Sequence, residues 1–177
     1  MSQRKSLLSR PLDLTYFIYV ATHIPITIFL DCQSLYPLHL TPQFLKDFNA
    51  YYLGEFKDPL VANARNMPWF KSFMWCEAIF QLPFFFWALR GLYHDTRLTR
   101  VGLLTYGTHV ATTVIPCLAE LAFGTASQAT LTSAERYTLI GFYIPYLLIP
   151  VTMVVDSYFK VSSMIRSDSS KPKPKQN

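Results

Sequence analysis

Four long runs of uncharged, mostly apolar residues dominate this sequence. Three of them hold no Lys, Arg, Asp or Glu, and the remaining one holds only Glu77. They cover residues 14–30, 72–89, 101–119 and 137–155, and are 17, 18, 19 and 19 residues long. A helix of about 20 residues crosses a hydrocarbon core about 30 Å thick, and about 17 residues suffice. We therefore predict an all-α membrane protein, a bundle of four transmembrane helices.

A soluble four-helix bundle is the main alternative. Its helices would carry a polar stripe along their outer faces, but the central turns of these runs hold no Lys, Arg or Asp. Charged residues make up only 15% of the chain, whereas about 25% is usual for soluble domains. This composition also excludes a disordered chain and a coiled coil. The first run exceeds the 7–15 apolar residues of a cleavable signal peptide, so we expect it to stay in the mature protein.

The three cysteines, Cys32, Cys76 and Cys117, show no CxxC spacing. Such isolated cysteines indicate neither a metal site nor a disulfide framework. We interpret them as small apolar packing residues. No metal ion and no cofactor is expected.

The basic residues predict the orientation of the bundle. Of the 16 Lys and Arg, 11 lie before the first run, between the second and third runs or after the fourth, and 5 lie between the first and second runs or between the third and fourth. The positive-inside rule then places both termini in the cytosol. We divide the chain into a cytosolic N-terminus (1–10), a four-helix transmembrane domain (11–160) and a disordered, basic cytosolic tail (161–177). The net charge of +5 reflects this bias and does not indicate nucleic-acid binding.

The long first connection, residues 32–68, contains aromatic residues spaced three to four apart. This spacing predicts a short amphipathic helix, which Thr41 as N-cap and Pro42 at the first helical position would begin. Its aromatic face would lie on the bilayer surface or roof the bundle. The aromatic residues are Phe44, Phe48, Tyr51, Tyr52 and Phe56.

Each predicted span also carries polar residues and at least one proline. His23, Thr27 and Asp31 follow one another at four-residue spacing and so share one helix face. Glu77 and Gln81 repeat the spacing in the second span. Because prolines remove backbone donors and bend helices, we predict kinked helices around a central cavity. The prolines are Pro25, Pro83, Pro116, Pro145 and Pro150.

Several of these polar residues have ordinary structural interpretations. His109, Thr112 and Thr113 in the third span are typical of hydrogen bonding between membrane helices. Asp31 lies at a helix end, where water could solvate it. Glu77 is different, because it lies inside a span with no Lys or Arg nearby in sequence. Two carboxylates that face an aromatic-walled cavity would attract an amine, so Asp31 and Glu77 are candidate ligand-binding acids.

Together, six motifs resemble the EXPERA-domain family of membrane proteins, in the same order and at matching spacing. The resemblance covers nearly the whole chain except the tails and residues 124–136. The motifs are His23-Ile-Pro-Ile-Thr-Ile-Phe-Leu-Asp31, Glu55-Phe-Lys-Asp-Pro-Leu60, Trp69-Phe-Lys-Ser-Phe73, Cys76-Glu77, Phe80-Gln-Leu-Pro-Phe-Phe85 and Tyr143-Ile-Pro-Tyr-Leu-Leu-Ile-Pro150.

This resemblance implies a four-helix protein of the endoplasmic reticulum, often a homodimer, whose pocket opens toward lipid and binds sterols and lipophilic amines. It implies that Asp31 pairs with the ligand amine, that Glu77 supports it, and that Asp58 is a third important acid. From the residues alone, Asp58-Pro59 is an N-cap followed by proline at the first helical position, which is a structural role. The other implied pocket residues are His23, Tyr52, Gln81, Thr113, Tyr143 and Tyr146.

The family implies three functions for such a chain. We favour a ligand-binding protein that acts in sterol homeostasis and trafficking over an enzyme. A sterol double-bond isomerase is the alternative, since the acids and His23 could donate and accept protons, but no isomerase-specific motif is present. A membrane assembly factor for protein import is the third. Lys173 and Lys175 resemble a dilysine retrieval signal, which fits the endoplasmic reticulum.

Overall fold

The computed structural model describes residues 6–169, and every regular element in this range is a helix. Four helical spans of 25, 27, 27 and 37 residues are long and apolar enough to cross a membrane. The predicted fold class is therefore confirmed: the chain is an all-α membrane protein with four transmembrane helices. Each predicted run lies inside its span, and the helices extend further at both ends of each run.

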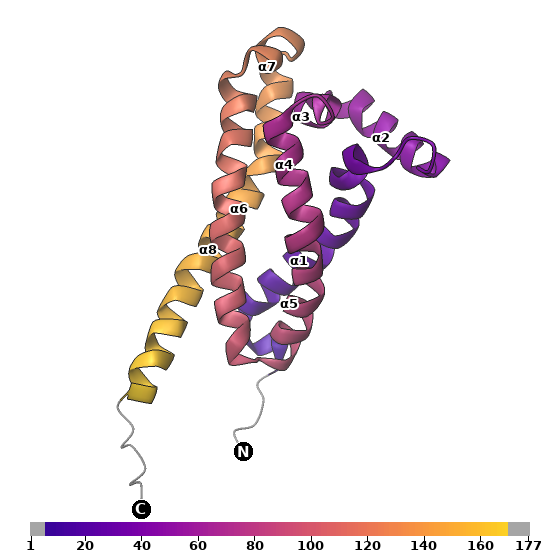
Figure 1. Ribbon diagram of the computed structural model, residues 1–177. Coiled ribbons are helices and arrows are strands. Elements are labelled where there is room, and N and C mark those ends of the chain that lie inside the picture. Colours follow the sequence, from indigo (N-terminus) through magenta and orange to yellow (C-terminus); the bar gives the residue numbers. More distant parts are fainter. Residues whose placement is uncertain (1–5, 170–177) are drawn as a thin grey trace, which may run out of the picture.

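The first two spans are interrupted, whereas the last two are single helices. The spans consist of α1 (Pro11–Phe29) with η2 (Asp31–Leu35), α4 (Pro68–Cys76) with η3 (Glu77–Gln81) and α5 (Leu82–His94), α6 (Arg97–Phe123), and α8 (Ser133–Ser169). The start of α1 and the end of α8 lie at one end of the bundle, which we call the terminal end (Figure 1). The opposite end, the loop end, carries α2 (Gln43–Phe56), α3 (Pro59–Asn63) and α7 (Thr125–Thr130).

The predicted amphipathic helix is present as α2, but its predicted start is wrong. The helix begins at Gln43, with Pro42 rather than Thr41 in the cap position. The Thr41 hydroxyl donates to the Pro37 carbonyl at 2.9 Å, so it stabilises the preceding turn and does not cap the helix. In contrast, Asp58 caps α3 and Pro59 occupies its first position, as the sequence predicts.

The tail also differs from its prediction. We expected residues 161–177 to be disordered, but α8 continues without a break to Ser169. No proline or glycine interrupts the chain between Pro150 and that point, and the first following proline is Pro172. At the N-terminal side, residues 7–9 form a single turn of 3-10 helix, η1 (Leu7–Ser9). Lys173 and Lys175 lie outside the described residues.

A π-helical turn accommodates the proline of the second span. In this turn, η3, the Leu82 amide donates to the Glu77 carbonyl five residues earlier. Pro83 follows at the start of α5 and supplies no amide donor. Single π turns inside long helices often mark functional sites. Both ends of this one, Glu77 and Gln81, are buried in the bundle.

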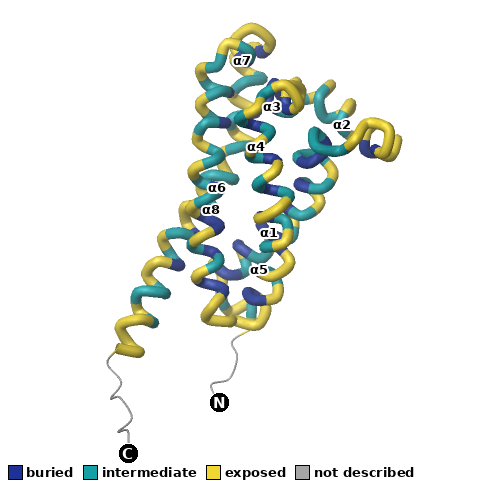
Figure 2. The backbone as a smooth tube through the Cα atoms, viewed as in Figure 1, coloured by how far each residue is buried: buried dark blue, intermediate teal, exposed yellow. Residues whose placement is uncertain are grey.

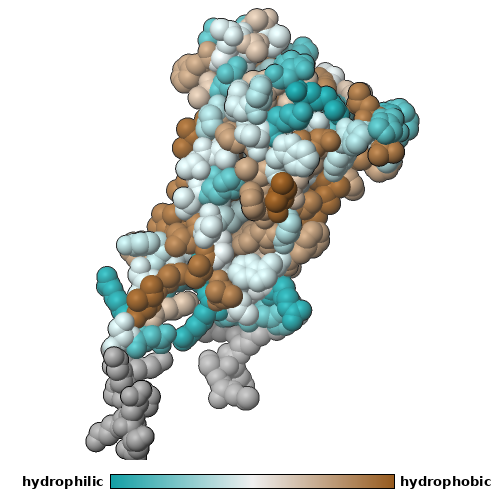
Figure 3. All heavy atoms as spheres, viewed as in Figure 1, coloured by the Kyte–Doolittle hydropathy of each residue, from teal (hydrophilic) through white to brown (hydrophobic). Residues whose placement is uncertain are grey.

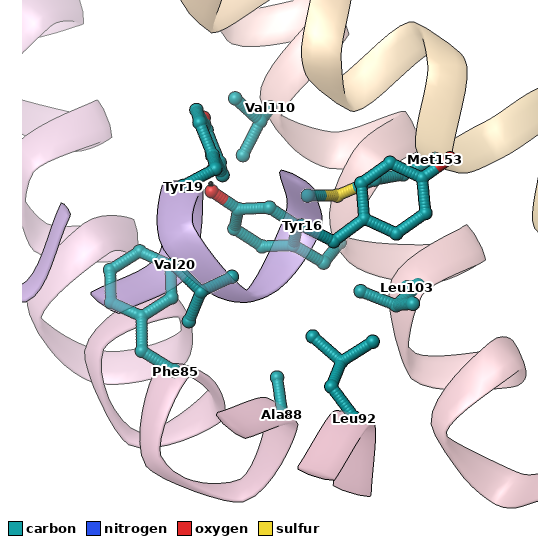
Figure 4. Packing of buried hydrophobic residues seen from close by; sticks show 10 residues of the cluster. Tyr16, Tyr19, Val20, Phe85, Ala88, Leu92, Leu103, Val110 and Met153 are labelled. Carbon is teal, nitrogen blue, oxygen red and sulfur yellow. Dashed lines mark hydrogen bonds between the residues drawn. The ribbon is translucent and has the colours of Figure 1, made fainter. Parts of the chain in front are cut away.

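The buried apolar side chains form two separate clusters. Figure 2 marks the buried positions in dark blue along the backbone. The cluster nearer the terminal end joins α1, α5, α6 and α8 through residues such as Tyr16, Phe85, Leu103 and Met153 (Figure 4). The other lies toward the loop end and includes Leu60, Phe70, Leu121 and Leu139. The helices are therefore well packed at two levels.

Helices α6 and α8 approach closely at one glycine. A methyl group on Gly107 would lie 2.6 Å from the Pro150 carbonyl oxygen and 3.3 Å from Met153 Cβ. Only glycine avoids this clash without moving one helix away from the other. The crossing point brings the two longest helices together at the terminal-end cluster.

A buried ionic cluster fixes the helices at the terminal end. Arg100 of α6 donates two hydrogen bonds of 2.6 Å to the two carboxylate oxygens of Asp13 in α1. Arg10 also donates to Asp13, and Lys160 of α8 lies 3.7 Å from it. The side chains of Asp13 and Arg100 are only 3% and 7% exposed. In the sequence these basic residues indicate only the orientation of the bundle, and nothing in their spacing predicts the network.

The outer surface matches a membrane environment. Apolar atoms cover much of the side of the bundle in Figure 3, and hydrophilic atoms gather toward its two ends. Large apolar side chains such as Phe80, Phe123 and Phe159 are 66–78% exposed. Exposure on this scale would favour aggregation in water, whereas lipid covers it in a membrane.

Candidate functional site

A cavity of about 790 Å³ lies between the two apolar clusters. Residues from all four spans and from α2 and α3 line it, so we call it the pocket. Its volume falls within the roughly 300–1,000 Å³ of pockets that hold drug-sized ligands. All eight residues that the sequence analysis selected for ligand binding line the pocket: His23, Asp31, Tyr52, Glu77, Gln81, Thr113, Tyr143 and Tyr146.

Three ionisable side chains meet inside the pocket. One side-chain atom each from His23, Asp31 and Glu77 lies within 4.8 Å of the others. Asp31 is the first residue of η2 and Glu77 is the first residue of η3, so each acid lies where its span departs from regular α-helix.

Glu77 is held by partners from the first span. The Thr27 hydroxyl donates to Glu77 Oε1 at 2.5 Å, and His23 Nε2 lies 3.7 Å from the same oxygen. Thr27 is fully buried and the Glu77 side chain is only 8% exposed. The predicted shared face of His23, Thr27 and Asp31 is therefore the face that meets Glu77.

The acid pair has no basic partner in the pocket. None of the described residues that line the pocket is a Lys or Arg. Burying an uncompensated carboxylate in apolar surroundings costs several kcal/mol or more. The pair therefore requires either protons of its own or a cation from outside to balance its charge.

Aromatic rings surround His23. Its ring stacks on Phe85 at 5.1 Å between centroids and meets the edges of Tyr19 and Tyr146 at 5.2 and 4.9 Å. Its Nδ1 is buried and makes no hydrogen bond within the described residues. The imidazole thus belongs to the aromatic wall on one side and points Nε2 toward Glu77 on the other.

Asp58 connects the loop end to two pocket tyrosines. Its carboxylate accepts hydrogen bonds from the Leu60 and Val61 amides at 2.9 and 3.3 Å, which caps α3. The other carboxylate oxygen accepts from the Tyr52 and Tyr143 hydroxyls at 3.0 and 2.9 Å. Complete burial raises the pKa of Asp58, although these four hydrogen bonds oppose the shift. Asp58 itself does not line the pocket; it orients two residues that do.

Two interpretations of the third span need revision. Thr112 and Thr113 do not bond to other helices, because their hydroxyls donate to the carbonyls of His109 and Val110 in their own helix. His109 does not line the pocket, and its buried Nε2 has no hydrogen-bond partner among the described residues. Thr113 contributes to the pocket wall through its position beside Val114 and Cys117 rather than through a free hydroxyl.

The sequence alone does not identify the apolar part of the pocket wall. Ile26, Phe70, Met74 and Ile149 line the pocket, but their residue types also cover the lipid-facing surface, so no sequence signal separates them. Thr27 was noticed for its spacing but was not selected as a site residue. Its i+4 position after His23 was the available signal.

The fold and the pocket together define a class: four-helix membrane proteins that enclose an acid-bearing apolar cavity within the bundle. The chain belongs to the EXPERA (EXPanded EBP superfamily) family, whose model matches residues 44–157. The resemblance stated from its motifs is thereby confirmed.

Individual relatives agree with this assignment. The chain is 42% identical to Sigma intracellular receptor 2 of Xenopus tropicalis over 156 residues, which cover 85% of this chain and 90% of the relative. It is 39% identical to the Homo sapiens protein of the same name over 149 residues, 78% and 82% of the two chains. Efficient mitochondria targeting-associated protein 19 of Schizosaccharomyces pombe is 29% identical over 147 residues, 82% and 74% of the two chains.

Proposed function

We propose that this protein binds sterols and lipophilic amines in the pocket and acts in sterol homeostasis or trafficking. The observation that carries the proposal is the uncompensated Asp31–Glu77 pair inside an apolar, aromatic cavity of about 790 Å³. A protonated amine supplies the positive charge that the pair lacks, and its apolar body replaces empty volume between the helices. A charge-assisted hydrogen bond in such surroundings is short and strong.

Sterols use the same pocket differently. A sterol is neutral, so its rings fill the apolar volume and its hydroxyl exchanges hydrogen bonds with the acid pair. The names of the animal relatives support a receptor, since each is called a sigma intracellular receptor.

Asp31→Asn tests this proposal. The substitution preserves shape and removes the charge, so cationic amines should bind about 1.5–3 kcal/mol more weakly, which is roughly ten- to a hundredfold. A neutral hydroxysterol should change much less. Competition binding of one ligand of each kind measures both effects, and Asp47→Asn, at an exposed acid of α2, serves as the control. Equal weakening of both ligands would show that Asp31 shapes the pocket but is not the counter-ion.

A sterol double-bond isomerase remains the second candidate. The observation in its favour is that His23 and two carboxyl groups meet within 4.8 Å, because isomerisation needs a proton donor and a proton acceptor beside the ring system. Incubation of the purified protein with a Δ8-sterol tests it, with formation of the Δ7 product as the readout. The name of the Schizosaccharomyces pombe relative suggests a third function, assistance to mitochondrial targeting.

We further propose that the protein resides in the endoplasmic reticulum membrane as a homodimer, with both termini in the cytosol. The 11-to-5 distribution of basic residues supports this orientation, and Lys173 and Lys175 support retrieval to this compartment. The homodimer rests on the family resemblance alone.

A further inference from the structure

A second cavity adjoins the pocket at the loop end. It encloses about 320 Å³ among η2, α2 and α3, and we call it the vestibule. Five residues line both cavities: Leu30, Asp31, Val61, Phe70 and Met74. Asp31 therefore lies on the wall that the vestibule and the pocket share.

The vestibule differs chemically from the pocket. Nine of its sixteen lining residues are apolar, but the lining also includes the polar residues Gln33, Ser34, Thr41 and Asn49 and the basic residues Lys46 and Arg65. The Ser34 hydroxyl is buried and makes no hydrogen bond within the described residues. Arg65 is held in place because its guanidinium donates to the Gln33 and Tyr36 carbonyls at 3.0 and 2.9 Å.

The two cavities therefore present three chemical environments in order. Hydroxyl, amide and basic groups lie among apolar residues in the vestibule, Asp31 follows at the shared wall with Glu77 behind it in the pocket, and apolar and aromatic groups make up most of the pocket wall. A complementary molecule has a hydroxyl or anionic group at its outer end, an ammonium group next to it, and a long apolar body. Simple lipophilic amines match only the last two environments.

We propose that the vestibule is a second binding subsite, and that it holds the hydroxyl end of a long-chain amino alcohol whose ammonium group lies at Asp31. The alkyl chain then occupies the pocket. This inference rests on the proposed amine binding and narrows its ligand class to amphiphiles that carry a hydrogen-bonding head group. A phosphate ester of the same alcohol places its anion beside Lys46 and Arg65.

The test compares octadecylamine with sphinganine, which has the same chain length and adds two hydroxyl groups beside the amine. Each compound competes with one labelled amine for the full-length protein in phosphatidylcholine nanodiscs, and the measurement is its competition affinity. Sphinganine should bind more tightly by on the order of three- to tenfold, the effect expected of one additional hydrogen bond or more. Equal affinities would overturn the proposal.

Ala50→Trp blocks the vestibule selectively. Ala50 is an exposed residue of α2 that lines the vestibule but not the pocket. The variant should bind octadecylamine as the wild type does and should lose the preference for sphinganine. Ala129→Trp, at an exposed position of α7 outside both cavities, is the matched control and should retain the preference. A preference that survives in Ala50→Trp would overturn the subsite.

Lys46→Ala tests the basic side of the vestibule. This exposed residue should matter little for sphinganine and should weaken sphinganine 1-phosphate several-fold. If Lys46→Ala weakened sphinganine and sphinganine 1-phosphate equally, the proposed position of the phosphate beside Lys46 would be wrong. If neither amine binds the wild-type protein, the proposed amine binding itself fails. If octadecylamine binds and sphinganine gains nothing, only the vestibule proposal fails.

Discussion

Thr27 of the first span donates a hydrogen bond of 2.5 Å to Oε1 of Glu77 in the second span. The bond crosses the interface between the two helices that supply the acids, and it occupies one oxygen of Glu77. It leaves the other oxygen for Asp31 or for a ligand. A buried threonine hydroxyl thus determines how one of the two acids faces the pocket.

Replacement of Thr27 with valine should weaken amine binding without unfolding the protein. Valine has nearly the same shape but no donor, so Glu77 loses the partner that orients it. We expect the affinity for a cationic amine to fall by about three- to tenfold, comparable to the loss of one hydrogen bond. The measurement is competition binding with the purified variant.

Thr22→Val is the matched control for this experiment. Thr22 lies on the same helix and lines the pocket, but its hydroxyl donates to carbonyls of its own helix. The Thr22→Val variant should bind the amine as the wild type does. Equal losses in both variants would mean that polarity of the wall, rather than the orientation of Glu77, controls binding.

Substitution of Asp58 should reduce stability more than it changes the chemistry of the pocket. Asp58→Ala removes four hydrogen bonds and leaves two amide donors of α3 and the Tyr52 and Tyr143 hydroxyls without their acceptor. We expect a loss of about 2–4 kcal/mol of unfolding free energy, on the scale of a lost N-cap together with unsatisfied buried groups. Tyr143→Phe removes one of these bonds and should lose about 0.5–1.5 kcal/mol. Thermal unfolding in detergent measures both.

The pH dependence provides a second test of Asp58. Its raised pKa in the folded state means that folding favours the neutral carboxyl. The contribution of Asp58 to folding stability is therefore complete below the ordinary pKa that this group has in the unfolded chain. It is lost as pH rises through the raised pKa of the folded state. Asp58→Asn cannot titrate, so the stability of the wild type relative to this variant should fall between acidic and neutral pH. A stability difference between the two proteins that does not change with pH would contradict the raised pKa of Asp58.

The spans and the two pocket acids could be predicted from sequence for a physical reason, whereas Tyr52, Tyr143 and Tyr146 followed only from the family resemblance. Ionisable groups are so costly in hydrocarbon that Asp31 and Glu77 stood out against their apolar neighbours. The helical repeat then placed His23 and Thr27 on the same face as Asp31. These signals depend on local composition and spacing, which a single sequence displays directly.

Other features depend on contacts between distant segments, which spacing does not show. The proline at position 59 predicts that Asp58 caps a helix. Its hydrogen bonds from Tyr52 and Tyr143, however, require α2 and α8 to lie beside the start of α3. The Asp13–Arg100 pair joins residues 87 positions apart. The start of α2 was misplaced because a threonine before a proline caps a helix in many sequences, whereas here the Thr41 hydroxyl bonds backward to Pro37.

The proposed topology predicts a pattern of glycosylation. If both termini face the cytosol, the loop end faces the lumen of the endoplasmic reticulum. An acceptor sequence introduced at Gln128 of α7, an exposed position, should be glycosylated, while one added after Asn177 should not. A mobility shift on a gel that glycosidase treatment reverses measures this. Modification of the C-terminal site instead would reverse the orientation.

The C-terminal lysines should act as an address rather than as part of the fold. Replacement of Lys173 and Lys175 with serine should let the protein reach later secretory compartments, because a retrieval receptor could no longer bind the tail. Microscopy of the tagged variant measures its distribution, and Lys171→Ser is the control. An unchanged reticular distribution would show that the membrane spans alone determine residence.

The Asp13–Arg100 pair should stabilise the bundle strongly, even though it lies at the end opposite the loop helices. Arg100→Met removes both 2.6 Å hydrogen bonds and leaves Asp13 buried with its remaining partners, the hydrogen bond from Arg10 and the 3.7 Å contact to Lys160. Loss of one partner from a buried ion pair costs about 3–5 kcal/mol. The remaining cations should keep the effect toward the lower part of that range.

Two further variants distinguish the loss of the buried ion pair from the loss of a positive charge as such. Arg97→Met changes an exposed arginine at the start of the same helix and should alter stability by less than about 1 kcal/mol. The double variant Asp13→Asn with Arg100→Met leaves no buried charge unpaired at this position and should recover much of the loss of Arg100→Met. Denaturant or thermal unfolding in one detergent compares the wild type, these variants and the single variant Asp13→Asn, which completes the cycle. If the double variant is as unstable as the sum of the single variants, the two residues act independently, and the coupling inferred from their geometry is wrong.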